Sequence, residues 1–248
     1  MDKAFAERPT LRAWLEEYAA IEREFVAAMA AEGPVFAPRA AGRPRADELR
    51  ETLRERGARF MNGEASVSTG FLSSACAACV GGCGSRTFYI DLRCNRDCYF
   101  CFNPNQADFE ERCTRDAPWR EELEAFGREV PEVTHVGLTG GEPLLRSDEA
   151  LAFLARAHEL YPTAHLRLYT SGMGLDEAFC AAAAECGLNE IRFSVKLDEG
   201  EGAVGEALAA IALARRFPID AMVEMPVVPA ELERMKLLLQ QLDDLGVR

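Results

Sequence analysis

The sequence has no apolar run long enough to cross a membrane and no excess of basic residues. A spanning helix needs about 20 predominantly apolar residues in a row, so no membrane segment is expected. Lys and Arg number 28 against 41 Asp and Glu, which gives a formal net charge of −13. Because nucleic-acid binding requires a basic surface to neutralise phosphates, this charge argues against a DNA or RNA partner.

A secretory signal and low-complexity tracts are also lacking. The first residues, MDKAFAERPT, are charged and polar, whereas a secretory signal has an apolar core. What the sequence does contain is nine cysteines. In a reducing compartment, so many cysteines indicate metal or redox chemistry more often than disulfides. We therefore expect a cytoplasmic protein.

The helix and strand patterns predict an α/β core behind a helical N-terminal extension. Residues 1–63 are expected to form the extension, with an amphipathic helix over 11–31 and a second helix over 47–60. Residues 64–85 form a cysteine-rich connector, and 86–248 form the core. Strands alternate with helices in the core, which requires a parallel sheet with helices outside it. The predicted strands are residues 86–92, 133–139, 165–170, 190–195 and 219–228.

Three cysteines, Cys94, Cys98 and Cys101, lie within the run LRCNRDCYFCF. Soft, anionic thiolates are the usual ligands of iron–sulfur clusters, and a 4Fe–4S cluster normally takes four cysteines. Three close cysteines therefore leave one iron open to a ligand that is not protein. Zinc sites and redox dithiols also use Cys-x-x-Cys pairs and are the alternative interpretations.

The position of these cysteines favours an active-site loop. They follow the first predicted strand, and the run TGGEPLL, with Gly140, Gly141 and Glu142, follows the second. The carboxyl ends of parallel strands are where α/β sheets and barrels place their chemistry. With Phe100 just before the last cysteine, the two motifs make residues 86–248 resemble the radical SAM superfamily.

This resemblance implies a fold, cofactors and a reaction. Cys94, Cys98 and Cys101 would hold a 4Fe–4S cluster whose open iron chelates S-adenosylmethionine (SAM). Reductive cleavage of SAM would give a 5′-deoxyadenosyl radical, which removes a hydrogen atom from a substrate. Electrons would come from a reductant such as flavodoxin or ferredoxin. The fold would be a partial parallel (β/α) barrel, of which five units are visible and a sixth is expected to be missing.

SAM-binding residues follow from the same resemblance. The two glycines of the GGE run would let the backbone approach the methionine part of SAM, because glycine has no side chain. Glu142 would accept a hydrogen bond from the SAM ammonium group, and Phe100 would lie beside the adenine. Ser194 and Lys196 end the fourth predicted strand and would contact the ribose and the carboxylate. Solvated strand-end residues are an equal alternative for these two.

A second cysteine group, Cys76, Cys79 and Cys83, precedes the first predicted strand. Its C-x2-C-x3-C spacing favours metal binding over free thiols, as an auxiliary iron–sulfur cluster or a structural zinc site. A strand rises about 3.3 Å per residue, so the intervening strand separates the two cysteine groups by roughly 20 Å. The second group is therefore expected at the opposite end of the barrel, without contact to SAM.

These motifs do not specify the substrate, and a peptide or a small metabolite is the leading hypothesis. An activating enzyme that installs a glycyl radical on a partner protein is the alternative within the family. Outside it, the alternative is a non-catalytic metal or electron-transfer module, which would need Cys113 as a fourth cluster ligand. A core that binds SAM without turnover is the third alternative.

Overall fold

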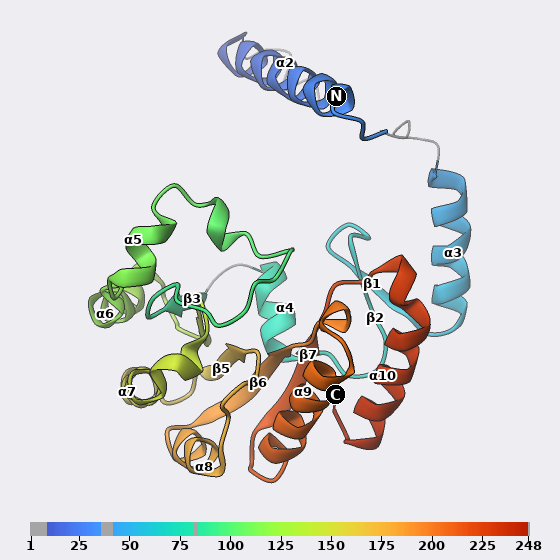
Figure 1. The fold of residues 1–248 in the computed structure, drawn as a ribbon. Coiled ribbons are helices and arrows are strands. Elements are labelled where there is room, and N and C mark those ends of the chain that lie inside the picture. The colour runs from blue at the N-terminus through green and yellow to red at the C-terminus, as the bar shows by residue number, and fades with distance from the viewer. Residues whose placement is uncertain (1–8, 36–41, 82–83, 248) are drawn as a thin grey trace. The chain divides into compact units, whose positions relative to one another are not determined.

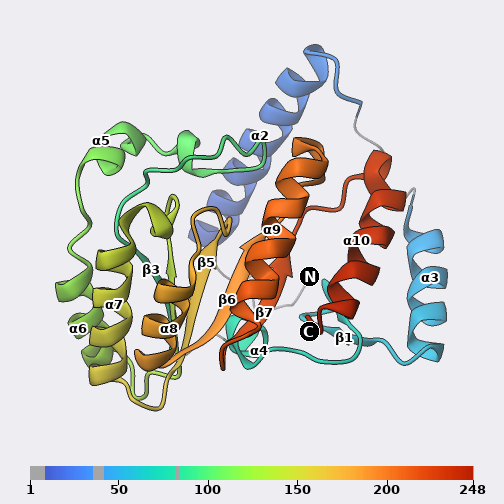
Figure 2. The same cartoon turned by 60° about the horizontal axis from the view of Figure 1, so that its bottom comes forward.

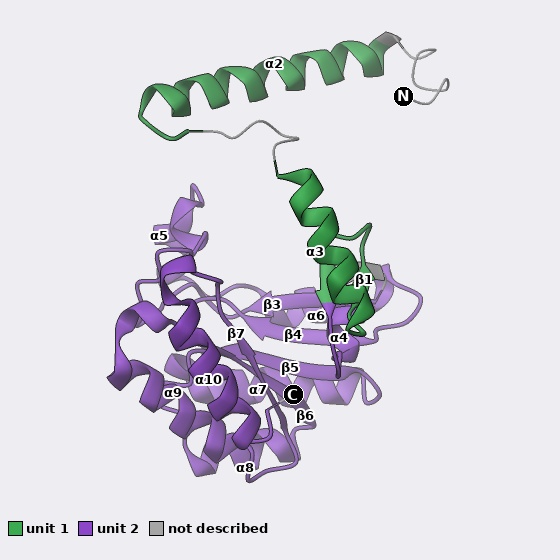
Figure 3. Cartoon of the chain, turned by 90° about the vertical axis from the view of Figure 1, so that its right-hand side faces the viewer, with its two compact units in different colours: residues 1–67 green, residues 68–248 purple. Residues whose placement is uncertain are grey.

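The structure is a computed structural model that describes residues 9–35, 42–81 and 84–247 (Figure 1). The chain divides into two compact units, residues 1–67 and 68–248 (Figure 3). The predicted segment boundaries after residues 63 and 85 stay predictions. None of the described helices is both long enough and apolar enough to span a membrane.

Two helices and a hairpin precede the core: α2 (Pro9–Ala31), α3 (Arg43–Glu55), β1 (Arg59–Met61) and β2 (Ser66–Ser68). The predicted stripe of α2 includes Trp14 and Tyr18, whose ring centroids lie 4.3 Å apart. The helix predicted over 47–60 ends early, because Gly57 adopts a left-handed conformation (φ +87°) that terminates α3. The residues after it form the hairpin instead, which the sequence analysis did not predict.

The second unit contains a five-stranded parallel sheet of order β3-β4-β5-β6-β7 (Figure 1). Its strands are β3 (Ser85–Tyr89), β4 (His135–Thr139), β5 (His165–Thr170), β6 (Leu188–Ser194) and β7 (Asp220–Glu224). Its α-helices are α4 (Ser74–Gly81), α5 (Phe109–Thr114), α6 (Trp119–Glu129), α7 (Ser147–Leu160), α8 (Glu177–Glu185), α9 (Glu201–Ala214) and α10 (Leu232–Asp244). Short 3-10 turns are η1 (Asn103–Asn105), η2 (Pro143–Arg146), η3 (Leu197–Glu199) and η4 (Pro229–Glu231). Within the described residues the sheet ends at β7, so the predicted partial barrel of five strands is confirmed.

The sheet has one apolar and one polar face, because side chains alternate along each strand. Helices α6 to α9 lie outside the curved sheet (Figures 1 and 2). The apolar side chains under them share one register layer, made of Phe88, Leu138, Leu168, Ile191 and Ala221. The neighbouring layer on the concave face is Thr87, Gly137, Arg167, Glu190 and Asp220. Buried apolar side chains thus form the outer face of the sheet, under the helices, and polar residues line the interior of the partial barrel.

Two short helices of the core were missed by the sequence analysis. α4 carries part of the upstream cysteine group, and α5 follows the main cysteine loop. Two strands also end earlier than predicted: β3 ends at Tyr89 rather than residue 92, and β7 ends at Glu224 rather than residue 228. In both cases the apolar pattern continues into the loop that leaves the sheet.

Candidate active site at the carboxyl end of the sheet

The loop after β3 carries three cysteines and lies beside the GGE run. It turns at Cys98, whose carbonyl accepts from the Cys101 amide over 2.9 Å. Cys94 is exposed, the other two are half-buried, and all three are free thiols. Burial raises the pKa of the Cys94 thiol, and an amide hydrogen bond at Arg96 lowers it. The Glu142 carboxylate and the other two cysteines raise that pKa further, so the net direction is upward.

Backbone hydrogen bonds join the GGE run to the cysteine loop. The Gly141 amide donates to the Asp91 carbonyl over 3.1 Å, and the Glu142 amide donates to the Arg93 carbonyl over 2.7 Å. A Cβ at Gly140 would lie 2.5 Å from the Asp91 carbonyl oxygen, and one at Gly141 would lie 1.8 Å from that of Arg93. Because Gly140 and Gly141 have no Cβ, the two loops can pack closely against each other. The contact of these glycines with SAM stays a prediction.

The buried carboxylate of Asp91 links the same two loops through ion pairs. Arg93 Nε donates to Asp91 Oδ2 over 2.9 Å, and Arg146 Nη1 donates to the same oxygen over 3.1 Å. Arg146 also donates to both oxygens of Asp116, over 2.9 and 3.0 Å, and this bond lowers the pKa of the Asp116 carboxyl. The network was not predicted from the sequence, although Asp91, Arg93 and Arg146 directly flank the two motifs.

The Glu142 side chain is buried and holds the end of β5. Its Oε1 accepts from Thr170 Oγ1 over 2.6 Å and from the Leu144 amide over 3.1 Å. Its Oε2 accepts from the amide and the hydroxyl of Ser171, both over 2.7 Å. These four hydrogen bonds use the full acceptor capacity of the Glu142 carboxylate. An ammonium group of SAM would therefore have to share one of these oxygens.

Lys196 lies buried next to the cysteine loop, so the solvated alternative for this residue is wrong. Its ammonium pairs with Glu199, which also pairs with Arg96. The Lys196 Nζ also lies 3.5 Å from the Asp97 carbonyl oxygen. Burial lowers the pKa of Lys196, but Glu199 and the Cys98 thiol raise it more, so the net pKa is raised. The positively charged ammonium of Lys196 thus lies beside Cys98.

Ser194 and Phe100 are placed at the same end of the sheet without a defined ligand contact. Ser194 ends β6, half-buried and in register with Glu224 of β7. Phe100 is partly exposed, and its ring meets that of Tyr99 edge to face with centroids 5.1 Å apart. Their roles at the ribose and adenine stay predictions. Asn103, which was not predicted, donates from Nδ2 to the carbonyl of the first GGE glycine over 3.0 Å.

The upstream cysteine segment lies on the concave face at the amino-terminal ends of the strands. α4 begins with a serine hydroxyl 3.2 Å from Nε2 of His135, the first residue of β4. Arg192 Nη2 donates to Cys76 Sγ over 3.2 Å. These contacts place the start of α4 opposite the end that carries the main cysteine loop. Cys83 and the side chain of Cys79 lie outside the described residues, so a second metal site stays a prediction.

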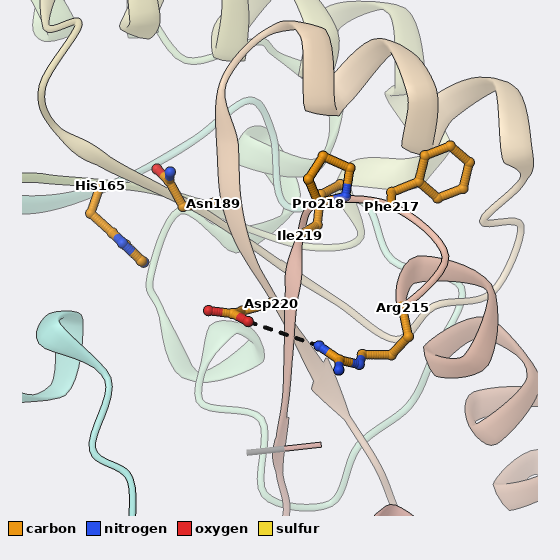
Figure 4. Close-up of a pocket in the computed structure, with 7 residues that line it drawn as sticks. All are labelled: His165, Asn189, Arg215, Phe217, Pro218, Ile219 and Asp220. Atoms are coloured by element: carbon orange, nitrogen blue, oxygen red, sulfur yellow. Dashed lines mark ion pairs between the residues drawn. The ribbon is translucent and has the colours of Figure 1, made fainter. Parts of the chain in front are cut away.

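A cavity of about 350 Å³ also opens at the amino-terminal end of the strands (Figure 4). It is lined by His165, Asn189, Arg215, Phe217, Pro218, Ile219 and Asp220. Arg215 and Asp220 lie across from each other in it, with charged atoms 3.9 Å apart. Parallel sheets place their active sites at the carboxyl ends of the strands, so this cavity is separate from the candidate site.

The model of the radical SAM superfamily matches residues 90–241, which is more than half of the chain. The match includes both motifs and strands β4 to β7. The chain therefore belongs to the radical SAM superfamily, whose members are enzymes that use a 4Fe–4S cluster and SAM.

Two curated relatives align with part of the chain. A Methanocaldococcus jannaschii protein assigned as a glycyl-radical enzyme activating enzyme is 29% identical over 169 residues, which are 64% of this chain and 44% of that protein. The PqqA peptide cyclase of Methylocella silvestris is 33% identical over 141 residues, 55% of this chain and 35% of the cyclase. The chain thus spans less than half the length of these relatives.

Two solved structures superpose on part of the chain. BtrN in an open conformation superposes with a TM-score of 0.35 and 22% identity, over 44% of this chain and 50% of BtrN. The radical SAM methyltransferase TsrM from Kitasatospora setae, solved with cobalamin and a 4Fe–4S cluster, gives a TM-score of 0.42 and 18% identity. That superposition covers 62% of this chain and 35% of TsrM.

Proposed function

We propose that this chain is a radical SAM enzyme whose active site lies where the cysteine loop meets the GGE run. The observation that carries the proposal is the backbone pairing of Glu142 with Arg93 and of Gly141 with Asp91. It holds a segment with three thiols against the strand end expected to bind SAM. Membership of the superfamily supports the same assignment.

The thiols of Cys94, Cys98 and Cys101 fit a 4Fe–4S cluster by their chemistry. Thiolate sulfur is the preferred ligand of such clusters. Within the described ranges, no three Cys, His, Asp or Glu side chains converge on one point for a single metal ion. A cluster does not need that convergence, because each cysteine binds a different iron. When bound, the cluster and SAM supply a 5′-deoxyadenosyl radical for hydrogen abstraction from the substrate.

The residues of the chain itself bind and orient the cluster and SAM and shield them from solvent. Glu142 keeps the end of β5 against the GGE run through Thr170 and Ser171, and so shapes the floor of the SAM site. Lys196 places a positive charge beside the cysteine loop, which favours both anionic thiolates and the SAM carboxylate. We assign Phe100 to the adenine and Ser194 to the ribose.

For the substrate we propose a peptide or a segment of a protein, with a small metabolite as the second candidate. The relatives support the first choice, because one is named for activating an enzyme and the other for cyclising a peptide. A reductant such as flavodoxin or ferredoxin would supply the electron. The acidic net charge of −13 is unfavourable for a nucleic-acid substrate.

The experiment that tests this function is anaerobic reconstitution of the full chain with iron and sulfide. Dithionite and SAM are then added, and 5′-deoxyadenosine is measured by mass spectrometry. We expect product from the unsubstituted chain and none from Cys98→Ala. Cys113→Ala is the matched control, because the hydrogen bond described for its thiol is a long one of 3.5 Å to the Leu92 carbonyl, so product formation should be retained.

Two outcomes would contradict the proposal. Loss of the cluster in Cys113→Ala would indicate four protein ligands and an electron-transfer module. A chain that takes up zinc instead of iron and does not respond to SAM would exclude the radical chemistry altogether.

We propose a second metal at Cys76, Cys79 and Cys83, either an auxiliary cluster or zinc. Elemental analysis of the reconstituted chain and of Cys79→Ser distinguishes the two. Iron and sulfide lost from Cys79→Ser would indicate a cluster, and zinc lost from it would indicate a structural site. An unchanged metal content would exclude both.

A further inference from the structure

The concave face of the sheet contains a buried arginine without a carboxylate partner among the described residues. Arg167, in the middle of β5, is 4% exposed. Its Nε is buried and makes no hydrogen bond, and its Nη2 makes one long bond of 3.4 Å to Thr87 Oγ1. Leaving a buried charge unpaired costs several kcal/mol. An arginine in this state is therefore expected to have a ligand as its partner.

The sheet register explains how the guanidinium reaches this position. Thr87, Gly137 and Arg167 are neighbours in one layer across β3, β4 and β5. A Cβ at Gly137 would lie 3.1 Å from Arg167 Nε and 3.1 Å from Thr87 Oγ1. The Arg167 side chain therefore lies across β4, where that strand has no side chain, and points toward the Thr87 hydroxyl.

The nearest carboxylate in the layer is already engaged. Glu190, the register neighbour of Arg167, accepts from Ser73 Oγ over 2.6 Å and from Arg192 Nε over 2.5 Å. Arg192 Nη1 also donates to Glu224 over 2.8 Å. The charge of Arg192 is thus compensated by two carboxylates, whereas Arg167 has none among the described contacts.

An aromatic ring provides the remaining neighbour. The guanidinium carbons of Arg167 and Arg192 each lie 5.6 Å from the ring centroid of Tyr169. A cation–π contact is weaker than an ion pair and does not neutralise a buried charge. The Tyr169 ring therefore lies beside both arginines and supplies no counter-charge to Arg167.

We propose that Arg167 binds a carboxylate of the substrate inside the partial barrel. A guanidinium pairs with a planar carboxylate through two parallel hydrogen bonds, and the Thr87 hydroxyl offers a third donor. β5 leads from Arg167 to Thr170 and Ser171, which contact Glu142. At about 3.3 Å per residue this is roughly 10 Å, so a substrate held by its carboxylate would extend toward the SAM site. The inference rests on the proposed function and narrows its substrate to a carboxylic acid, such as an acidic peptide.

The first test compares two buried arginines in the full chain, reconstituted anaerobically with iron and sulfide. Arg167→Met removes an unpaired charge and is expected to raise the apparent Tm by about 2 to 4 °C, the shift that about 1 kcal/mol produces in a domain of this size. Arg192→Met removes the arginine partner of Glu190 and Glu224 and is expected to lower the Tm. A fall in Tm for Arg167→Met as large as that for Arg192→Met would make Arg167 a structural residue and overturn the proposal.

The second test uses N-acetylglycine as a carboxylate probe, with N-acetylglycinamide and inorganic phosphate at equal millimolar concentrations. We expect N-acetylglycine alone to raise the Tm of the unsubstituted chain, with no response in Arg167→Met. Gly137→Ala crowds the guanidinium and should reduce the response, whereas Gly205→Ala, where a Cβ meets nothing within 4 Å, should not. An equal response to the amide, a larger response to phosphate, or a response that persists in Arg167→Met would overturn the assignment.

These readouts are independent of SAM cleavage. If the unsubstituted chain forms no 5′-deoxyadenosine but binds N-acetylglycine through Arg167, the carboxylate site stands and the proposed function fails. If it forms 5′-deoxyadenosine but does not respond to N-acetylglycine, the function stands and the carboxylate site fails.

Discussion

The backbone amide of Glu142 donates to the carbonyl oxygen of Arg93 over 2.7 Å. This bond joins two loops that are far apart in the sequence. The loops meet because β3 and β4 are parallel neighbours and end at the same edge of the sheet. Asp91 reinforces the contact, through its own carbonyl and through its pairs with Arg93 and Arg146. A change in the GGE run is therefore expected to disturb the cysteine loop as well.

Gly141→Ala should disrupt cluster binding without touching a cysteine. The new Cβ would lie 1.8 Å from the Arg93 carbonyl oxygen, so the two loops must separate, at a cost of about 1 to 3 kcal/mol. We expect a lower iron and sulfide content after reconstitution and a correspondingly reduced yield of 5′-deoxyadenosine. Gly205→Ala is the matched control on α9 and should behave as the unsubstituted chain. Full cluster occupancy in Gly141→Ala would contradict the packing role.

Thr170→Val should weaken the support of Glu142 while leaving its charge in place. It removes a buried 2.6 Å hydrogen bond, which is expected to lower the free energy of unfolding by about 1 to 2 kcal/mol. Glu142→Gln should cost more, because its amide group would face the Ser171 donors. Urea unfolding measures stability, and equilibrium dialysis measures SAM affinity. Unchanged stability in both variants would mean that these bonds do not hold β5.

Glu190→Gln should reduce stability at neutral pH but not in strong acid. Burial alone would raise the pKa of Glu190, but contacts with His165, Ser73 and Arg192 lower it from 4.5 to about 2. A carboxyl whose pKa falls on folding stabilises the protein above its unfolded pKa, here by on the order of 3 kcal/mol. That contribution is lost as the pH falls from about 4.5 to about 2. Urea unfolding across this range should show the difference from the unsubstituted chain shrinking, whereas a constant difference would contradict the assignment.

Much of the fold could be predicted because its patterns are local. The strand over residues 165–170 was predicted with its observed bounds, and the order of strands and helices required the parallel sheet. The misses are short elements. The hairpin of β1 and β2 and the helix α4 are too brief to show a period, and packing rather than propensity determines where they form.

By itself the sequence determined the cysteine loop, the GGE run and their positions after two strands, because spacing and strand pattern are properties of one continuous segment. Only the tertiary structure decided that Glu142 binds Thr170 and Ser171, that Lys196 is buried beside Cys98, and that Arg167 has no carboxylate partner among the described residues. These facts depend on which strands are neighbours and on their register. Both are set by packing between residues that are distant in the chain, and a local sequence pattern does not predict such packing.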